Sequence, residues 1–392
     1  GGSLLTQDDA AGTTVTVAHA NSILGDLSKG FVTVNGDELS NDQTIRFDIH
    51  QAGENDPVAE GIYGVTLRTT GDAGQGQDLS IDYSLAGVNL LKTLDFAGVS
   101  DDRDDTANIF KGYIKGSGNL RITDNTVYLT NSSNAYSGST TVVDGATLYA
   151  DAQALGQTSE LNTDGSTYIL GDNEVHGLNV GEDGLLVIGD DTFADPENFV
   201  TLTLRSDSQA DHVISGNLRG NGVLEVFGDG QVDDGIPPDL RIEGSQGGYA
   251  GKLNLADGAW VHIKATDGTL FGNSAAQNDV TVSGKALLTI ESDLDRDGSF
   301  YGVFRNGSDG LGGTVEITLG DAENKFYFAE TQAEAGFNGR FVMNKGTIDF
   351  NELLTSGSSD NDPLAQATLE LGQDGIALLS ESDVASVVDS QL

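Results

Sequence analysis

The stretch TVVDGATLYADAQALGQTSELNTDGSTYILGDNEVHGLNVGEDGLLV, residues 141–187, decides the fold class of this chain. The turn dipeptide Asp-Gly recurs in it at Asp144-Gly145, Asp164-Gly165 and Asp183-Gly184, so the spacings are 20 and 19 residues. Three short strands and three turns use about 20 residues, so this period predicts one coil of a β-solenoid per repeat. We therefore expect coils of roughly 20 to 25 residues.

Alternation of apolar and polar residues runs through the rest of the chain. Examples are GVLEVF at 222–227, VTVSGKALLTI at 280–290 and TVEITL at 314–319. A period of two that is interrupted every few residues by Gly, Asp or Asn is typical of short strands joined by tight turns. The chain has 53 Gly but only 5 Pro, and the prolines stay outside the alternating runs. The sequence thus predicts an all-β fold.

The charge of the chain is strongly negative, with 61 acidic and 19 basic residues and a formal net charge of -42. A field of this sign repels phosphate groups, so we expect neither nucleic acid nor an anionic membrane surface as a partner. Hydrophobic residues make up 37% of the chain, which is too many for a disordered acidic chain. No run has the length and apolarity of a membrane-spanning helix, so we expect no membrane insertion by this segment.

The chain contains no cysteine. Disulfides, thiol catalysis and cysteine-based metal sites are therefore excluded. The absence of cysteine is compatible with export, where premature disulfides would block passage, and equally with many cytosolic proteins.

A longer pattern, aromatic-x-Gly-x-x-x-apolar-x-(Asp/Lys)-Gly-(Ala/Thr), occurs at residues 136–146, 249–259 and 337–347. Glycine-rich units precede the first two copies, at residues 112–122 and 216–226. Such a unit alone is similar to a phosphate-binding loop, but the Lys-(Ser/Thr) pair of that loop is missing and a strand pattern follows. We interpret both patterns as one repeated structural module.

This module resembles a repeat of a known family. Residues 136–148, followed by Ala154-Leu155-Gly156, resemble the passenger-associated repeat of bacterial autotransporters. The copy that begins at Tyr249 keeps the pattern, and residues 337–350 resemble passengers of the AIDA-I adhesin type. The resemblance covers roughly residues 112–380, and its motifs are structural.

The resemblance implies a secreted passenger domain, folded as a right-handed parallel β-helix with a few loop insertions and displayed outside a Gram-negative cell. We expect a single domain over 1–392, with N-terminal coils at 1–110 and repeat-bearing coils at 111–392. Such passengers commonly act as adhesins or aggregate cells in biofilms. The implied partners are a host extracellular-matrix protein such as fibronectin, a glycan such as a glycosaminoglycan, or a second copy on another cell. No enzymatic activity is expected.

The alternative function is a polysaccharide hydrolase or lyase, because β-helices also carry such enzymes. Their sites use clustered carboxylates as acid and base, sometimes with calcium. Asp is abundant in this chain, so paired Asp residues alone are weak support for an active site. No serine-nucleophile motif accompanies the 5 His.

The run Asp293-Leu-Asp295-Arg-Asp297-Gly298 is the candidate metal site. Alternating carboxylates before a glycine are the first half of a calcium loop, because hard cations need convergent oxygens and a sharp turn. The twelfth position, where a bidentate Glu belongs, is Phe304. The run is therefore either a calcium site or a solvated acidic turn, and no other cofactor is expected.

Insertions that break the coil period are the candidate recognition loops, because loops on a rigid scaffold commonly carry binding. They are residues 51–62, 99–109, 229–240 and 292–310. The side chains expected to contact a ligand are Asp101, Asp102, Asp104, Asp233, Asp234, Phe300, Tyr301 and Arg305. For the aromatic residues, a place in the core of an irregular coil is equally compatible with the pattern.

Overall fold

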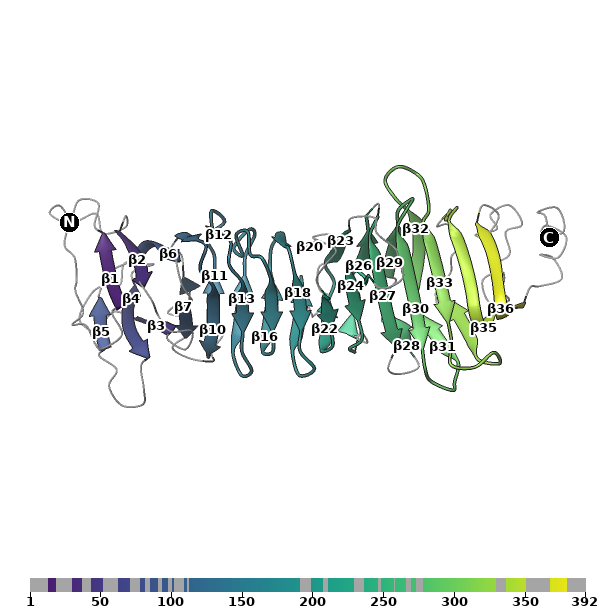
Figure 1. Ribbon diagram of the computed structural model, residues 1–392, viewed down its shortest axis with the longest axis horizontal. Helices are drawn as coiled ribbons and strands as arrows, with labels where there is room; N and C mark the ends of the chain where they lie inside the picture. Colours follow the sequence, from purple (N-terminus) through teal and green to yellow (C-terminus); the bar gives the residue numbers. More distant parts are fainter. Residues whose placement is uncertain are drawn as a thin grey trace. The chain divides into compact units, whose positions relative to one another are not determined.

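The structure is a computed structural model of the chain (Figure 1). From residue 113 onward it describes residues 113–190, 199–206, 211–228, 236–245, 248–256, 258–265, 269–272, 278–328, 336–349 and 367–378. Before residue 113 it describes Asp101 and the strands named below.

The chain divides into two compact units, Gly1–Gly177 with Asp183–Leu186, and Leu178–Glu182 with Val187–Leu392. Within the described residues every regular element is a β-strand, so the predicted all-β class is confirmed. These residues include no helix long and apolar enough to cross a membrane.

The strands of the first unit are β1 (Thr13–Ala18), β2 (Gly30–Gly36), β3 (Thr44–Gln51), β4 (Tyr63–Thr70), β5 (Asp78–Ile81), β6 (Leu85–Leu90), β7 (Leu94–Ala97), β8 (Ile109–Phe110), β9 (Tyr113–Gly116), β10 (Leu120–Asp124), β11 (Thr126–Leu129), β12 (Ala135–Tyr136), β13 (Thr140–Val142), β14 (Thr147–Ala150), β15 (Leu161–Thr163), β16 (Ser166–Ile169) and β17 (Asn173–Val175). β19 (Leu185–Ile188) has residues in both units.

The strands of the second unit are β18 (Leu178–Val180), β20 (Thr201–Arg205), β21 (Val213–Ile214), β22 (Asn217–Gly220), β23 (Val223–Phe227), β24 (Leu240–Ile242), β25 (Gly248–Tyr249), β26 (Lys252–Leu255), β27 (Trp260–Ala265), β28 (Thr269–Phe271), β29 (Asn278–Val282), β30 (Leu287–Ser292), β31 (Gly298–Phe300), β32 (Gly302–Asn306), β33 (Thr314–Thr318), β34 (Lys325–Phe328), β35 (Arg340–Asp349) and β36 (Thr368–Leu378).

The sequence predicts coils from residue 1 onward, but the first strands mix antiparallel pairs with parallel ones such as β2 with β6 and β3 with β7. β1 is antiparallel to β2, and β4 is antiparallel to both β3 and β5. From β8 onward the described pairs of the first unit are parallel. Antiparallel neighbours need only a local connection, and this segment lacks the aromatic-x-Gly module that accompanies the parallel coils.

The parallel coils of the first unit have the period that the sequence predicts. Leu120 lies opposite Thr140 and Thr140 opposite Leu161, so successive coils advance by 20 and 21 residues. At the Asp-Gly turn that follows β13, Gly145 has a positive φ of 78°. Residues with a side chain rarely adopt this conformation, which explains the glycine at this turn.

Two of the parallel sheets of the second unit carry the charged outer faces described below (Figure 1). We call β18, β21, β24, β27, β30, β33, β35 and β36 the long sheet, since each is parallel to the next. We call β20, β23, β26, β29 and β32 the side sheet. His262 lies opposite Thr289, so here the coil advances by 27 residues, more than predicted. β26 and β27 have only 4 and 6 residues, so the additional length lies in the connections.

Alternate side chains of the strands build an apolar interior. Leu253 on β26 lies opposite Val280 on β29, Leu255 lies opposite Val282, and all four are 0% exposed. Burying such a side chain stabilises the fold by about 1.5–3 kcal/mol. The intervening residues point outward, so the parallel β-helix has one apolar inside and polar outer faces.

The glycine of the aromatic-x-Gly module is a point of close approach between coils. A Cβ added at Gly138, Gly251 or Gly339 would lie 2.1, 2.0 or 2.3 Å from the carbonyl oxygen of Gly118, Gly222 or Gly313, respectively. The carbonyls of Gly118 and Gly222 belong to the glycine-rich units at residues 112–122 and 216–226, so the two sequence patterns meet in space. The aromatic ring of the module is buried beside this contact, as at Tyr249, whose hydroxyl donates to the carbonyl of Lys252 at 2.7 Å.

Buried asparagines also join neighbouring coils. Asn278 is 0% exposed, and its Nδ2 donates to the carbonyls of Tyr249 and Gly251 at 3.1 and 2.8 Å. In the first unit, Asn134 donates to the carbonyl of Ala154 at 2.6 Å in the same manner. These amides satisfy buried backbone groups at the coil corners.

Replacing Gly251 by alanine tests the close approach between coils. We expect the free energy of unfolding to fall by about 3 kcal/mol, because backbone must move to admit the methyl group. The matched variant Gly145→Ala meets nothing within 4 Å. It should cost only about 1 kcal/mol, because its cost is the positive φ alone. Urea unfolding of both variants measures the difference, and equal losses would contradict the contact.

Candidate functional site

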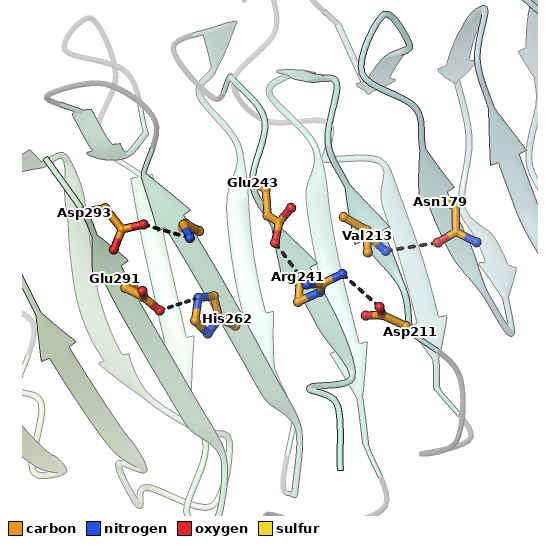
Figure 2. A network of polar contacts seen from close by, with 9 residues as sticks. Asn179, Asp211, Val213, Arg241, Glu243, His262, Glu291 and Asp293 are labelled. Carbon is orange, nitrogen blue, oxygen red and sulfur yellow. Dashed lines mark hydrogen bonds and ion pairs between the residues drawn. The ribbon is translucent and has the colours of Figure 1, made fainter. Parts of the chain in front are cut away.

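The outer face of the long sheet carries a network of charged side chains (Figure 2). Along β24 and β27 buried and partly exposed residues alternate, so the polar residues point outward. The register places Arg241 of β24 opposite His262 of β27. Two residues farther along, Lys264 of β27 lies opposite Glu291 of β30. Side chains at equal positions therefore form columns across the sheet.

Arg241 lies between two carboxylates (Figure 2). Its Nη2 is 2.9 Å from Oδ2 of Asp211, and its Nη1 is 3.2 Å from Oε1 of Glu243. A partly exposed ion pair contributes at most about 1 kcal/mol to stability. The two carboxylates therefore orient the guanidinium on the face more than they stabilise the fold.

Lys264 and Asp293 form the next ion pair along the face. Their Nζ and Oδ2 atoms are 2.9 Å apart. The hydrogen bond from Lys264 lowers the pKa of Asp293, and the same contact raises the pKa of Lys264. Both groups are therefore charged over a wide pH range, and both side chains are well exposed to solvent.

His262 is the titratable group at the centre of the network. Its Nε2 is 3.4 Å from Oε2 of Glu291. Burial lowers the pKa of His262 below its ordinary value of 6.5, and the opposing effects of Glu291 and Glu243 are smaller. The imidazole is therefore mostly neutral at pH 7, and protonation would add a positive charge to this face.

Trp260 adds an aromatic side chain to the same strand face. Its indole Nε1 donates to Oγ1 of Thr289 at 3.3 Å, and its backbone N–H donates to Oδ2 of Asp239 at 2.8 Å. Trp260 and His262 occupy alternate positions of β27, and the burial pattern of the strand places both on its outward face. The face thus combines acidic, basic and aromatic groups.

This arrangement is suited to contact with another surface. Its cations and carboxylates are presented on adjacent strands, about 4.8 Å apart. Asp211 and Glu243 are paired with Arg241, and Asp293 is paired with Lys264, so the face presents a ladder of paired charges. The carboxylate of Glu291 lies beside His262. Such groups are positioned for many weak polar contacts made together.

The structure does not bring the predicted calcium ligands together. Asp293 is paired with Lys264, whereas Oδ1 of Asp297 accepts the backbone N–H of Lys325 at 2.7 Å. Asp295 is exposed to solvent. In the part of the chain that the structure describes, no group of three acidic, His or Cys side chains could hold a metal ion. Calcium binding here stays a prediction from the sequence.

Phe300 is a core residue, so its expected place in a ligand-contact loop is wrong. It is 0% exposed, and its ring stacks on that of Phe304 with the centroids 4.7 Å apart. Phe271 and Phe326 pack against it at 5.8 and 5.7 Å. The segment 292–310 is likewise no simple insertion, because it contains β31 and β32, which continue the parallel pairing. Phe300 therefore has the other place that the sequence allowed for the aromatic residues, in the core of a coil.

Arg305 and Tyr301 remain near the surface. Arg305 lies on β32, and its side chain is 41% exposed. Tyr301 is half-buried, directly before β32. The structure places Arg305 on the outer face of the side sheet, whereas Phe300, with which the sequence grouped it, is buried.

The acidic loop candidates are mostly outside the described residues. Asp101 is exposed, and its backbone carbonyl accepts a hydrogen bond from Oγ1 of Thr126 at 3.4 Å. The other four, Asp102, Asp104, Asp233 and Asp234, lie outside the part that the structure describes.

Sequence reasoning did not single out Glu243, Lys264 or Glu291. Strand alternation places each of them outward, which is a signal that the sequence contains. Their proximity depends on the register, for example on Lys264 lying opposite a residue 27 positions later. That offset differs from the period of about 20 residues that predicts the coil.

The core position of Phe300 leads to a test by truncation. We expect Phe300→Ala to lower the free energy of unfolding by about 3–5 kcal/mol, because it opens a cavity in an aromatic cluster. The matched variant Arg305→Ala, five residues away, should cost at most about 1 kcal/mol. Thermal unfolding of both variants measures this. A Phe300→Ala protein as stable as the wild type would contradict the core assignment.

The lowered pKa of His262 predicts a pH dependence of stability. The unfolded chain takes up this proton near pH 6.5, before the folded chain does. The stability that the neutral His262 contributes to the folded state is therefore fully present above that pH. It is lost as the pH falls through the pKa that His262 has in the folded state. In the His262→Gln variant, the loss of stability that comes from protonating His262 at low pH should disappear. Unfolding midpoints between pH 5 and 8 measure it, and identical slopes for both proteins would refute the assignment.

Comparison with known proteins finds relatives of limited similarity. No protein-family model and no solved structure matches the chain. The chain is similar to the uncharacterized lipoprotein YdeK of Escherichia coli (strain K12), with 28% identity over 414 aligned residues, 97% of this chain and 27% of YdeK. It is also similar to the uncharacterized protein YuaQ of the same organism, with 32% identity over 244 residues, 57% of this chain and 16% of YuaQ. The chain thus spans only a minor part of the length of either relative.

Proposed function

We propose that the chain is the adhesive passenger part of a bacterial cell-surface protein. It would attach cells to host matrix proteins or glycans, or join cells to one another in aggregates and biofilms. The observation that carries this proposal is the ladder of paired charges on the long sheet, from Arg241 through Lys264 to Asp293.

A ladder of this kind suits adhesion because its contacts are repeated. One exposed ion pair is worth at most about 1 kcal/mol, too little for specific attachment. Several pairs on a stiff β-helix can meet a partner together, and many molecules on one cell multiply the effect. The net charge of -42 keeps the scaffold soluble between such contacts.

An envelope location is supported by the name of one relative, because YdeK is described as a lipoprotein. Export through the outer membrane and display outside the cell are supported by the resemblance of residues 112–380 to autotransporter passengers. Both are parts of the proposal.

The alternative of a polysaccharide-degrading enzyme has less support. A glycosidase needs two carboxylates that face each other across the scissile bond, one of them able to hold a proton. On the long sheet, Asp211 and Glu243 flank a guanidinium, and the pKa of Asp293 is lowered by Lys264. The Asp293 carboxylate therefore stays ionised, which suits polar contact better than acid catalysis.

Adhesion of beads coated with the chain tests the proposal. We expect coated beads to aggregate or to attach to surfaces bearing matrix proteins or glycans. Lys264→Glu should reduce attachment several-fold, because the ladder loses a cation and gains a repulsive carboxylate. Lys285→Glu changes the net charge equally at an exposed turn and should leave attachment unchanged.

Two results would refute this function. One is a coated bead that neither aggregates nor attaches to any surface in the panel. The other is release of reducing sugar from a glycan that the chain binds, which would establish the enzyme instead.

A further inference from the structure

The outer face of the side sheet has a different charge pattern from the long sheet. Each of its five strands carries one charged residue, and the sign of the charge alternates from one strand to the next. In the order β20, β23, β26, β29 and β32 these residues are Arg205, Glu225, Lys252, Asp279 and Arg305. Three cations thus accompany two carboxylates among these described residues. On a chain with a net charge of -42, this face is locally positive. We call these five residues the side-sheet ladder.

Asp279 is shared by two cations. Its Oδ1 is 2.6 Å from Nε of Arg305, and its Oδ2 is 3.4 Å from Nζ of Lys252. The side chains of Lys252 and Arg305 are 35% and 41% exposed, whereas that of Asp279 is 20% exposed. One carboxylate neutralises only one of the two cations. The ratio of charges is reversed at Arg241 on the long sheet, where two carboxylates are paired with one cation.

An exposed aromatic ring adjoins this pair of cations. Phe199 is 38% exposed, and Nζ of Lys252 lies 4.2 Å from its ring centroid. Asn254 and Thr281 lie in register between Glu225 and Arg305, so amide and hydroxyl groups stand next to the charges. The surface therefore offers an apolar ring, hydrogen-bonding groups and surplus positive charge within a few strands.

We propose that this face binds an acidic saccharide, that is, a sugar chain bearing carboxylate groups. The C–H groups of a sugar ring would pack on Phe199, whose π face is electron-rich. The carboxylate would accept charge-assisted hydrogen bonds from Lys252 and Arg305, and guanidinium suits a carboxylate especially well. Asn254 and Thr281 would bind sugar hydroxyls. This ligand deepens the proposed function and rests on it, because it adds a saccharide-binding face on the side sheet to the adhesive ladder of the long sheet.

The negative charge of the chain does not prevent such binding at physiological salt. Screening reduces interactions between exposed charges beyond about 8 Å, so a ligand group in contact with two cations is governed mainly by them. Binding should therefore weaken as salt increases, since the contacts are partly exposed.

A matched pair of ligands tests the proposal with the whole chain. The probe is a galacturonic acid oligosaccharide, and its control is the same oligosaccharide with the carboxyl groups reduced to alcohols. Calorimetry should show about 10-fold tighter binding of the acidic form, because only that form makes charge-assisted hydrogen bonds. Equal affinity for the two forms, or no binding of either, would overturn the proposal.

Substitutions in the side-sheet ladder distinguish recognition from a structural role. Lys252→Gln and Arg305→Gln should each weaken binding of the acidic form several-fold, whereas Lys285→Gln at an exposed turn should not. Asp279→Asn should strengthen binding several-fold, because it removes the carboxylate that competes with the ligand. Loss of binding in Asp279→Asn, or an equal loss in Lys285→Gln, would contradict the assignment. Circular dichroism of each variant confirms that it is folded.

Two further outcomes separate this inference from the proposed function. If coated beads adhere but the acidic oligosaccharide does not bind, the saccharide site is wrong and adhesion stands. If the oligosaccharide binds with the expected preference but beads do not adhere, the adhesive function is wrong and the site stands. Binding to vesicles of anionic lipid without binding to the oligosaccharide would replace the sugar by a membrane surface and overturn the proposal.

Discussion

The contact between backbones at the module glycines sets the geometry of the described coils. Where Gly251 meets the carbonyl of Gly222, no side chain has room, so neighbouring coils are held at backbone distance. The strands are then about 4.8 Å apart in a fixed parallel register. Side chains that lie opposite one another on successive strands therefore form rows, both in the apolar interior and on the outer faces. The buried columns and the ladders of charge are therefore two results of one register.

The fold could be predicted from sequence because its signals are local and repeated. The Asp-Gly turns give the coil its period, and the positive φ of Gly145 explains the glycine at the first of these turns. The aromatic-x-Gly module identified the repeat, although only the structure shows that its glycine meets the glycine-rich unit of the preceding coil. Pairing of β1 with β2 and of β3 with β4 could not be predicted, because alternation alone does not distinguish antiparallel from parallel neighbours.

The candidate site was less predictable, because it depends on residues that are distant in sequence. The register brings Lys264 and Glu291 together, and no local pattern encodes a 27-residue offset. Phe300 was expected in a contact loop because aromatic residues near charges are common in interfaces. Its neighbours in space are other phenylalanines, which the interior gathers from successive coils. Arg305, from the same segment, faces outward because it occupies the alternate position on a strand.

The shared register also limits how a chain of this kind can change in length during evolution. One residue gained or lost within β27 would turn the following side chains to the other face and bring charges such as Lys264 into the interior. Gain or loss of a complete coil leaves both faces in order, because the next strand meets an equivalent neighbour. Such genes are therefore expected to lengthen by whole coils. Each added coil extends every outer face by about 4.8 Å, and with it the span that one molecule can cover.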